Sequence, residues 1–553
     1  MSIKRPRWIV WVLLLLWLIP QHNGIQAQDT PLSIAEQVNN LTLEQKVAQM
    51  MIVSIFGPAV NEPAAAMIRT WQPGAIVLLP SNLENPAQIT RLTNEIQTIT
   101  LENGTIPAFI TVDQEGGIIA RLDEGFTDWP VPSLLTATGN TDLAYAFGQA
   151  LATELRAVGI NMNLAPVADL QSEIDNPVIG RRAFGDDPVQ VSPIVASVIA
   201  GMQDTNVLAT AKHFPGHGAT TVDSHLELPV LPFTAEELFN RELLPFTTAI
   251  ENASVGAIMM SHIHFPTFDP DEALPASLSQ NIVTGLLRNR IGYDGIILTD
   301  ALDMDAIDTV YSPEESVIRA IQAGNDMVLV GAHTIPSVHI SVMQALVEAV
   351  RAGTIPESQI DASVTRILQA KAEMNVLNWQ PLDDATANER INTEAHSTLI
   401  QQMFTEGTTI AQDTNSLLPL SANSLVIYPG TRPSLDDICE RPGVTKLSVN
   451  LNPTPDDIQR ASIAARSVDT VVYFTQNVTE NLQQATLVEN LPLDRTVVVA
   501  LWSPFDYFDL PVMSTYVVVY SPFLVAHTPV CDILHGDAPA LGTLSVDFSR
   551  PLP

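Results

Sequence analysis

Eight short apolar segments, separated by amphipathic stretches, constrain the fold of this chain more than any other feature of its sequence. Apolar runs of strand length that alternate with helical segments are typical of parallel strands whose two faces are both buried. Three of the intervening stretches, residues 143–158, 191–205 and 235–251, have helical periodicity. The predicted strands span residues 51–56, 75–79, 108–112, 161–166, 208–212, 257–261, 296–299 and 327–330.

This alternation predicts an α/β protein in which a (β/α)8 TIM barrel, residues 28–385, is followed by a smaller α/β/α sandwich domain, residues 386–553. A doubly wound open sheet is the alternative for the first eight strands. The barrel should close with the helix that follows Pro356, and a polar linker leads out of it. The strands of the second domain are predicted at residues 424–428, 471–474, 496–501 and 516–520.

The sequence pattern at the N-terminus predicts a signal peptide, residues 1–27. Three basic residues precede an apolar run, residues 8–19, and the small residue Ala27 marks a cleavage site. About a dozen apolar residues are too few for a membrane-spanning helix, which needs about 20. We therefore expect a secreted or extracytoplasmic protein that has no contact with a membrane beyond this export signal.

The charge of the chain argues against a nucleic-acid partner. Its 553 residues include 61 acidic and 26 basic side chains, for a net charge of −35. So large a negative charge repels nucleic acids and anionic membrane surfaces. The two cysteines, Cys439 and Cys531, could form a disulfide in an exported protein or stay as free thiols. The sequence leaves both states open, because it does not give the distance between them.

Polar and ionisable residues follow five of the eight predicted strands. In a TIM barrel the carboxyl ends of the strands share one face, and the active site is built there. A single Asp or His beside a strand is usually structural, but five strand ends in succession indicate a functional site. These residues are Asp113, Asp169, Lys212, His213, His262 and Asp300.

Two pairs of histidines raise the hypothesis of metal-assisted hydrolysis. His213 and His217 are four residues apart, and His262 and His264 are two apart, which are spacings that metal sites use. A Pro-Gly step separates the first pair, so the two rings cannot share one face of a helix. The first predicted strand, residues 51–56, also contains no His, Cys, Asp or Glu side chain that could bind a metal ion. We therefore expect no metal and no other cofactor.

Glycosyl transfer through a carboxylate nucleophile is the second hypothesis. It needs an anionic oxygen below the anomeric carbon and a proton donor on the leaving-group side. Asp300 could be the nucleophile, and Asp223 with His225 could supply the proton. Residues two apart in an extended loop point the same way, and a carboxylate stabilises a protonated imidazole. Glycines 216 and 218 would let this loop close over a substrate.

At these residues the sequence resembles glycoside hydrolase family 3, in its β-N-acetylglucosaminidase (β-N-acetylhexosaminidase) branch. The loop KHFPGHGATTVDSHLELP, residues 212–229, carries the most specific part of the resemblance. It extends to TVDQEGGIIARL, NPVIGRRAFGDDP, IMMSHIHFP and GIILTDALDMDAI, and to LHGDAPALGTLSVDF near the C-terminus. The resemblance implies a barrel followed by an α/β/α domain, retention of the anomeric configuration, and no metal.

The resemblance also implies roles for individual residues. Asp300 corresponds to the nucleophile, and Asp223 and His225 correspond to the acid/base dyad that this branch uses in place of a glutamate. Arg121 corresponds to an arginine behind the sugar site. The resemblance is not the basis for Asp169 and His217, which we expect to serve mainly loop structure, the usual role of such residues. The residues implied in substrate binding are Asp113, Arg121, Arg182, Lys212, His213 and His262.

The sequence departs from the family pattern at Ile118, where Arg is frequent, and at Ala183, where Ser is frequent. The expected function is exo-hydrolysis of terminal β-linked N-acetylglucosamine from chitooligosaccharides or peptidoglycan fragments. A family 3 β-glucosidase and an N-acetylglucosaminide phosphorylase are the nearest alternatives, and a non-catalytic sugar-binding module is an alternative from another class. The natural aglycone and the role of the C-terminal domain stay open at this point.

Overall fold

The computed structural model describes residues 32–104, 106–270, 273–332, 334–430, 435–436, 438–522 and 526–548. The predicted signal peptide, residues 1–27, lies outside the described residues. No helix within these ranges is long and apolar enough to cross a lipid bilayer.

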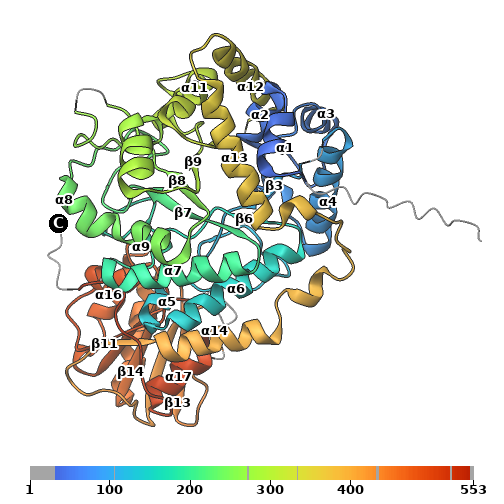
Figure 1. Ribbon diagram of the computed structural model, residues 1–553. Helices are drawn as coiled ribbons and strands as arrows, with labels where there is room; N and C mark the ends of the chain where they lie inside the picture. The colour runs from blue at the N-terminus through green and yellow to red at the C-terminus, as the bar shows by residue number, and fades with distance from the viewer. Residues whose placement is uncertain are drawn as a thin grey trace, which may run out of the picture.

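The N-terminal part of the chain is a closed barrel (Figure 1). Among the described residues, eight parallel strands pair in the order β10-β1-β2-β3-β6-β7-β8-β9. A parallel bridge between Leu298 and Met327 joins the two ends of this order. The predicted TIM barrel is thus confirmed, and the open sheet is excluded. The strands are β1 (Met51–Ser54), β2 (Ala75–Val77), β3 (Phe109–Val112), β6 (Met162–Asn163), β7 (Leu208–Phe214), β8 (Ala257–Met260), β9 (Ile296–Thr299) and β10 (Val328–Leu329).

Helices cover the outside of the barrel (Figure 1). The first two predicted helices are α6 (Thr141–Ala157) and α7 (Pro188–Asp204), whose N-caps Asn140 and Asp187 accept hydrogen bonds from the first turn. The remaining helices of this part are α1 (Ile34–Asn40), α2 (Leu43–Gln49), α3 (Glu62–Trp71), α4 (Pro86–Glu102), α5 (Ser133–Thr138), α10 (Asp305–Asp308), α11 (Pro313–Ala323), α12 (Pro336–Arg351) and α13 (Glu357–Glu373).

The third predicted helix, residues 235–251, is divided into three pieces. A short helix α8 (Ala235–Glu237) runs into a π-helical turn, Leu238–Glu242, and then into α9 (Leu244–Ala253). A second π-helical segment, Asn281–Ile291, precedes β9. The π-helical turn buries Glu242 against Gly216 in the loop that follows β7, which periodicity alone does not indicate.

The C-terminal part is a smaller layered domain, drawn in orange and red below the barrel in Figure 1. In the described residues its sheet has the order β11-β16-β15-β14-β12-β13, with β11 antiparallel at one edge. The predicted sandwich domain is confirmed. Its elements are β11 (Thr409–Asp413), β12 (Ser424–Pro429), β13 (Val444–Val449), β14 (Thr470–Thr475), β15 (Thr496–Ala500), β16 (Thr515–Val518), α14 (Glu394–Gly407), α15 (Pro455–Ala464), α16 (Gln483–Glu489) and α17 (His527–His535).

The two strands that the sequence does not predict, β11 and β13, are the edges of this sheet. Most of their side chains are only partly buried, so they lack the continuous apolar run of a central strand. The predicted domain boundary at residue 385 falls between α13 and α14 and stays a prediction.

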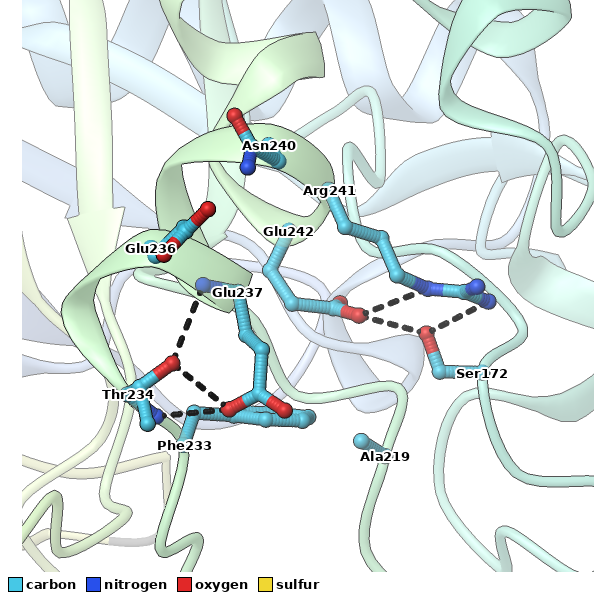
Figure 2. A pocket seen from close by; sticks show the side chains of 9 residues that line it. All are labelled: Ser172, Ala219, Phe233, Thr234, Glu236, Glu237, Asn240, Arg241 and Glu242. Carbon is cyan, nitrogen blue, oxygen red and sulfur yellow. Dashed lines mark hydrogen bonds and ion pairs between the residues drawn. The ribbon is translucent and has the colours of Figure 1, made fainter.

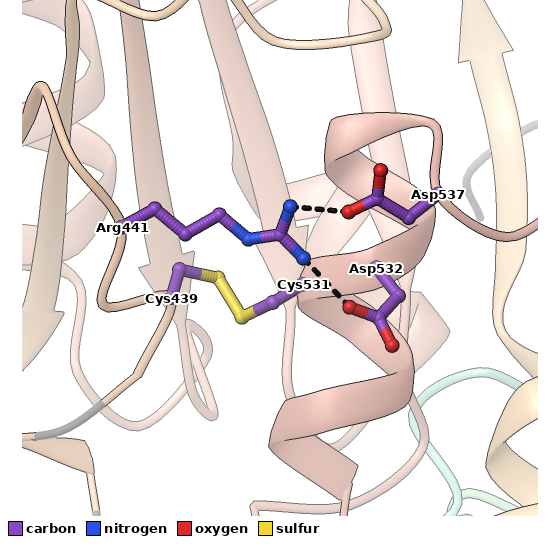
Figure 3. Close-up of a disulfide and its surroundings, with 5 residues drawn as sticks. All are labelled: Cys439, Arg441, Cys531, Asp532 and Asp537. Atoms are coloured by element: carbon purple, nitrogen blue, oxygen red, sulfur yellow. Dashed lines mark hydrogen bonds and ion pairs between the residues drawn. A yellow bond between two sulfur atoms is a disulfide. The ribbon is translucent and has the colours of Figure 1, made fainter.

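The cysteines are joined. Cys439 and Cys531 form a disulfide that ties the segment before β13 to α17, with their Cα atoms 5.2 Å apart (Figure 3). Beside it, the guanidinium of Arg441 pairs with Asp532 at 2.7 Å and with Asp537. Of the two states that the sequence leaves open, the structure has the disulfide.

Residues 545–547, near the C-terminus, contact the barrel. The backbone N–H of Asp186 donates to the carbonyl of Ser545 at 3.1 Å, and the N–H of Asp547 donates to the Asp186 carboxylate at 2.9 Å. Gly185 permits this approach, because a Cβ there would lie 2.3 Å from the Ser545 oxygen. The C-terminal domain is therefore fixed beside the loop that carries Arg182.

Candidate active site

The predicted site residues come from consecutive strands at the carboxyl end of the barrel. Asp113 follows β3, His262 follows β8, and Asp300 follows β9. Lys212 and His213 belong to β7, whose register with β8 shifts between Lys212 and Phe214. This irregularity lets two successive side chains reach the same site, where a regular strand would send them to opposite faces.

A buried cluster of charges lies on one side of the site. Lys212 Nζ is 2.7 Å from Asp113 Oδ1 and 2.8 Å from Glu115 Oε1. Arg182 binds both Glu115 oxygens, at 2.8 and 2.9 Å. Burial by itself would raise the pKa of Glu115, but Lys212 and Arg182 lower it to about 2. Glu115 is thus a permanent anion that fixes two of the predicted sugar-binding cations.

Sequence reasoning missed Glu115, although it stands two residues from Asp113. Only 1% of the Glu115 side chain is exposed, whereas 25% of Asp113 is. Asp113 is therefore the carboxylate of this cluster that is open to a ligand. The motif DQEGG contains two acids, and Glu115 is the second. The position of polar residues after the predicted strands does not distinguish Glu115 from its neighbours.

His213 is oriented by Asp169. The Nδ1 atom of His213 is 2.7 Å from Asp169 Oδ2, and its backbone N–H also donates to this carboxylate. The N–H of His217 donates to Asp169 Oδ1 at 2.7 Å. Asp169 thus has the loop-structuring role expected of it, and it also turns the Nε2 atom of His213 toward Asp300, at 3.9 Å.

Asp300 lies at the mouth of the barrel with its carboxylate partly open. Its Oδ1 accepts from the N–H of Ala301 at 2.7 Å, and 23% of its side chain is exposed. Burial would raise the pKa of Asp300, but His213, His262 and the Ala301 N–H outweigh it and hold the pKa below its usual value. Because Oδ1 of the ionised Asp300 carboxylate accepts this hydrogen bond, Oδ2 is the oxygen that could act as a nucleophile.

His262 holds the backbone next to Asp300. Its Nδ1 lies 2.8 Å from Ser277 Oγ, and its Nε2 lies 2.9 Å from the carbonyl oxygen of Ala301. The ring is buried, and burial lowers its pKa. Both nitrogens are therefore engaged within the protein, and its predicted contact with the sugar stays a prediction.

The segment that follows Ala211, residues 212–228, has two unlike halves. We call it the catalytic loop because it carries the predicted acid/base pair. We call residues 212–218 the anchored half and residues 221–228 the exposed arm. Every residue of the anchored half is buried. A Cβ on Gly218 would lie 1.5 Å from the carbonyl oxygen of Leu170, so this glycine serves close packing. Gly216, at a φ of 137°, packs against Glu242. Neither glycine is placed as a free hinge, contrary to the expectation from the sequence.

The exposed arm carries the predicted acid/base pair. His225 Nδ1 is 2.7 Å from Asp223 Oδ1, and the same oxygen accepts from the His225 backbone N–H at 2.8 Å. Burial tends to raise the pKa of Asp223, but these two hydrogen bonds lower it overall. Because 58% of the His225 side chain is exposed, its Nε2 is accessible to a substrate.

Two contacts tie the exposed arm to the site. His217 Nε2, in the anchored half, is 2.8 Å from Ser224 Oγ in the arm. The backbone N–H of Asp305, which follows the strand of Asp300, donates weakly to the carbonyl of His225 at 3.4 Å. The arm therefore rests against the segment that carries the candidate nucleophile.

A pocket of about 820 Å³ lies behind this loop, and Figure 2 shows its lining. Glu242 Oε1 accepts from Ser172 Oγ at 2.7 Å and from Arg241 Nε at 3.3 Å. Burial raises the pKa of Glu242. Since its side chain also contacts Gly216, Glu242 braces the anchored half from outside the site. Nothing in the sequence pattern points to this residue.

Arg121 lies apart from the buried charge cluster. Its side chain lines a pocket of about 520 Å³ together with Glu84, Asp123 and Glu124, and with none of the other predicted site residues. Its backbone N–H donates to Gln114 Oε1 at 2.8 Å. In the described part of the chain, no group of three or more His, Cys, Asp or Glu side chains is arranged to hold a metal ion.

Comparison with known proteins identifies similar sequences over most of the barrel. The profile described as "Glycosyl hydrolase family 3 N terminal domain" matches residues 42–370. Beta-hexosaminidase A of Pseudoalteromonas piscicida is 30% identical over 387 residues, 66% of this chain and 63% of that protein. The chain thus spans less than two thirds of this relative. A beta-hexosaminidase of Nitrosomonas eutropha is 34% identical over 286 residues, 51% of this chain and 80% of that protein.

Solved structures extend the similarity to both domains. A glycoside hydrolase family 3 beta-N-acetylglucosaminidase from Paenibacillus sp. str. FPU-7 is 32% identical, with a TM-score of 0.82, over 93% of this chain and 99% of that chain. A beta-glucoside phosphorylase is 22% identical, with a TM-score of 0.79, over 93% of this chain and 96% of that chain. The second likeness concerns the fold alone.

Proposed function

Because the chain belongs to glycosyl hydrolase family 3, we propose that it is a retaining exo-β-N-acetylglucosaminidase that releases terminal β-linked N-acetylglucosamine. The Paenibacillus structure at 32% identity, described as a beta-N-acetylglucosaminidase, supports this substrate class. The observation that carries the proposal is the Asp223–His225 pair on the exposed arm. This arm contacts the segment that follows Asp300, a partly exposed carboxylate whose pKa is lowered.

In the first step, Asp300 Oδ2 attacks the anomeric carbon while the glycosidic C–O bond breaks. His225 donates the proton on Nε2 to the departing oxygen and becomes neutral. Asp223 holds Nδ1 and stabilises the protonated ring before the transfer. The products are a free aglycone and a covalent glycosyl ester on Asp300.

In the second step, neutral His225 takes a proton from water, whose oxygen attacks the anomeric carbon and releases Asp300. Two inversions at the same carbon restore the β configuration. The Asp113–Lys212 pair would bind sugar hydroxyl groups, and the partial exposure of Asp113 supports this role. Arg182 acts through Glu115, because it fixes the carboxylate that in turn holds Lys212.

The test is to compare initial rates on the p-nitrophenyl β-glycosides of N-acetylglucosamine and of glucose, with and without phosphate. We expect the N-acetylglucosaminide to be the better substrate, the rate to be independent of phosphate, and the β anomer to be released first. A faster glucoside would favour the β-glucosidase alternative, and a strict need for phosphate would favour a phosphorylase. No turnover of either glycoside would favour a binding module.

We also propose that the protein is exported. The pattern of residues 1–27 supports this, and so does the Cys439–Cys531 disulfide, since stable disulfides form mainly in oxidising compartments. Mass spectrometry of the mature protein should find a new N-terminus close to Gln28. A soluble cytoplasmic protein that keeps Met1 would overturn the proposal.

A further inference from the structure

A pocket of about 550 Å³ lies between the two domains, and we call it the interdomain pocket. The barrel contributes Ile118 and the segment 174–181 to its lining. The C-terminal domain contributes residues that follow β14 and β15, among them Asn477 and Phe505. In open α/β sheets ligands bind outside the carboxyl ends of the strands, which is where this pocket is placed.

The interdomain pocket adjoins the candidate active site. The carbonyl of Val178, in its lining, accepts from Arg182 Nη1 at 3.2 Å. Asn176 Nδ2, also in the lining, donates to the carbonyl of His217 at 2.9 Å. The pocket therefore borders the loop that carries Arg182 and the anchored half of the catalytic loop. A pocket that borders both Arg182 and this loop is near enough to the sugar site to receive the next part of a longer substrate, which in the proposed mechanism is the aglycone.

The lining combines apolar faces with hydrogen-bonding groups. Phe505 and Phe508 stack with their ring centroids 6.3 Å apart. Ile118 is 37% exposed, although it is a large hydrophobic residue. Arg181 lies 4.7 Å over the ring of Trp502 and donates to Asn477 Oδ1 at 2.9 Å. Apolar surfaces with a few fixed polar groups are typical of pockets for small ligands, and the volume suits one or two sugar rings.

The charges of the pocket select among aglycones. Among the described lining residues there is one cation, Arg181, against four acids: Asp175, Glu480, Asp506 and Asp509. In the adjoining site the cations Lys212 and Arg182 are already paired with Asp113 and Glu115. A carboxylate on the ligand would thus meet excess negative charge, whereas a neutral or amine-bearing sugar would not.

We infer that the interdomain pocket is an aglycone subsite for neutral or amine-bearing sugars, as in intact or partly deacetylated chitooligosaccharides. The carboxylate-bearing N-acetylmuramyl residue of peptidoglycan fragments is disfavoured there. This inference rests on the proposed function and assigns the C-terminal domain a share in substrate choice.

The first experiment compares Phe505→Ala with the wild-type protein on two substrates. Chitotriose fills the aglycone side, whereas β-N-acetylglucosaminyl azide has a leaving group too small to do so. We expect kcat/KM for chitotriose to fall roughly 5- to 20-fold, and kcat/KM for the azide to change less than about twofold. A melting temperature near that of the wild type confirms that the variant folds. Equal effects on both substrates, or no effect on chitotriose, would overturn the inference.

The second experiment tests the charge preference. We expect the wild-type kcat/KM for chitobiose to exceed that for the N-acetylglucosaminyl–N-acetylmuramic acid disaccharide by about tenfold or more. The double variant Asp175→Asn/Glu480→Gln should lower this ratio at least about threefold, and the exposed-surface control Glu348→Gln should leave it unchanged. A wild-type ratio below one, or a ratio that the double variant does not alter, contradicts the preference. If the azide itself is not hydrolysed by the wild type, the proposed function fails, and the inference falls with it.

Discussion

The two halves of the catalytic loop are adjacent in sequence but differ in how they are held. The anchored half is buried, is bonded to Asp169, and packs without room for a Cβ on Gly218. The exposed arm leaves 58% of the His225 side chain open and contacts its surroundings mainly through Ser224 and one weak backbone hydrogen bond. The groups that are proposed to hold the sugar are thus fixed, whereas the group that is proposed to transfer the proton lies on a segment with few contacts.

This difference separates two contributions to catalysis. A nucleophile and sugar-binding residues act best when they are preorganised, because their alignment then costs nothing during the reaction. A residue that is first an acid and then a base must face a leaving group and afterwards a water molecule. Changes in the fixed region should therefore affect every substrate, whereas changes in the exposed arm should depend on the leaving group.

The largest effect should follow from removing the proposed nucleophile. Asp300→Ala should lower kcat roughly 10⁴-fold or more for every substrate, because no covalent intermediate can form. A 2-fluoro sugar should label the peptide that contains Asp300 in the wild type and should not label the variant. Asp308→Ala, at an exposed position in α10, is the matched control and should retain activity. Labelling of a different carboxylate would refute the assignment.

A smaller, selective effect should follow from changing the exposed arm. His225→Ala should slow substrates with poor leaving groups roughly 10²- to 10⁴-fold, the usual contribution of general acid catalysis. A dinitrophenyl glycoside, which needs no proton to depart, should lose much less in the glycosylation step. Azide should restore part of the deglycosylation rate, since this anion needs no base.

The control for this variant is Leu226→Ala, because Leu226 is the neighbour in the arm and is 69% exposed. It should behave like the wild type with both kinds of leaving group. If His225→Ala slowed good and poor leaving groups equally in the glycosylation step, His225 would not be the acid, and the arm would only position the substrate.

The free energy of unfolding should also distinguish the buried charge cluster from the exposed arm. Glu115→Ala leaves Lys212 and Arg182 without their shared carboxylate, and breaking such a buried pair typically costs about 3–5 kcal/mol. Asp223→Ala acts on the exposed arm and should change the free energy of unfolding by less than about 0.5 kcal/mol. Urea unfolding of both variants measures this contrast. Similar losses in the two variants would show that the arm is as tightly held as the cluster.

The same contrast explains what can be predicted from the sequence. The barrel strands are predictable because both of their faces are buried, so each one is an apolar run. Asp113, Lys212, His213 and Asp300 are predictable as neighbours because the carboxyl ends of parallel strands meet on one face. The Asp223–His225 contact follows from a two-residue spacing in an extended loop, and the structure has it.

What the sequence does not indicate are partners that come from other segments. Glu115 is one of two acids in a short motif, and only the fold shows that Lys212 and Arg182 converge on it. Glu242 reaches Gly216 through a π-helical turn inside a segment that looks like a regular helix. The packing role of Gly218 depends on the Leu170 carbonyl, which lies in a different loop.

The C-terminal domain offers a third kind of restraint, a covalent one. Replacing both cysteines, Cys439→Ala/Cys531→Ala, should lower stability by about 2–4 kcal/mol, because the unfolded chain gains conformational freedom. Since the disulfide lies within that domain, kcat on β-N-acetylglucosaminyl azide should change less than about twofold. A proportional loss of activity at temperatures where the variant is folded would show that the site depends on this tie.

The smallest predicted effect concerns pH and again belongs to the anchored half. Burial, assisted by the nearby His213, lowers the pKa of His217 from 6.5 to about 4. Below pH 6.5 the unfolded chain therefore binds a proton at this position that the folded protein excludes. The free energy of unfolding should fall as the pH decreases from about 6.5 to about 4. At pH 5.5, one unit below the unfolded value, His217 alone should account for a loss of about 1 kcal/mol relative to pH 6.5.

His217→Gln removes the titrating ring and should make the decline in urea stability between pH 6.5 and pH 4 shallower. The decline should not vanish, because burial also lowers the pKa of His339 and of His527 to about 4. The matched variant Leu226→Ala changes the exposed arm without removing a titrating group, and it should leave the slope as it is in the wild type. Glu115 does not confuse the measurement above pH 4.5, because its pKa is lowered from 4.5 to about 2, and its contribution is lost only as the pH falls through that lower range. If His217→Gln left the decline unchanged, protonation of the buried imidazole would not be coupled to folding, and the anchored half would not differ from the exposed arm in this respect.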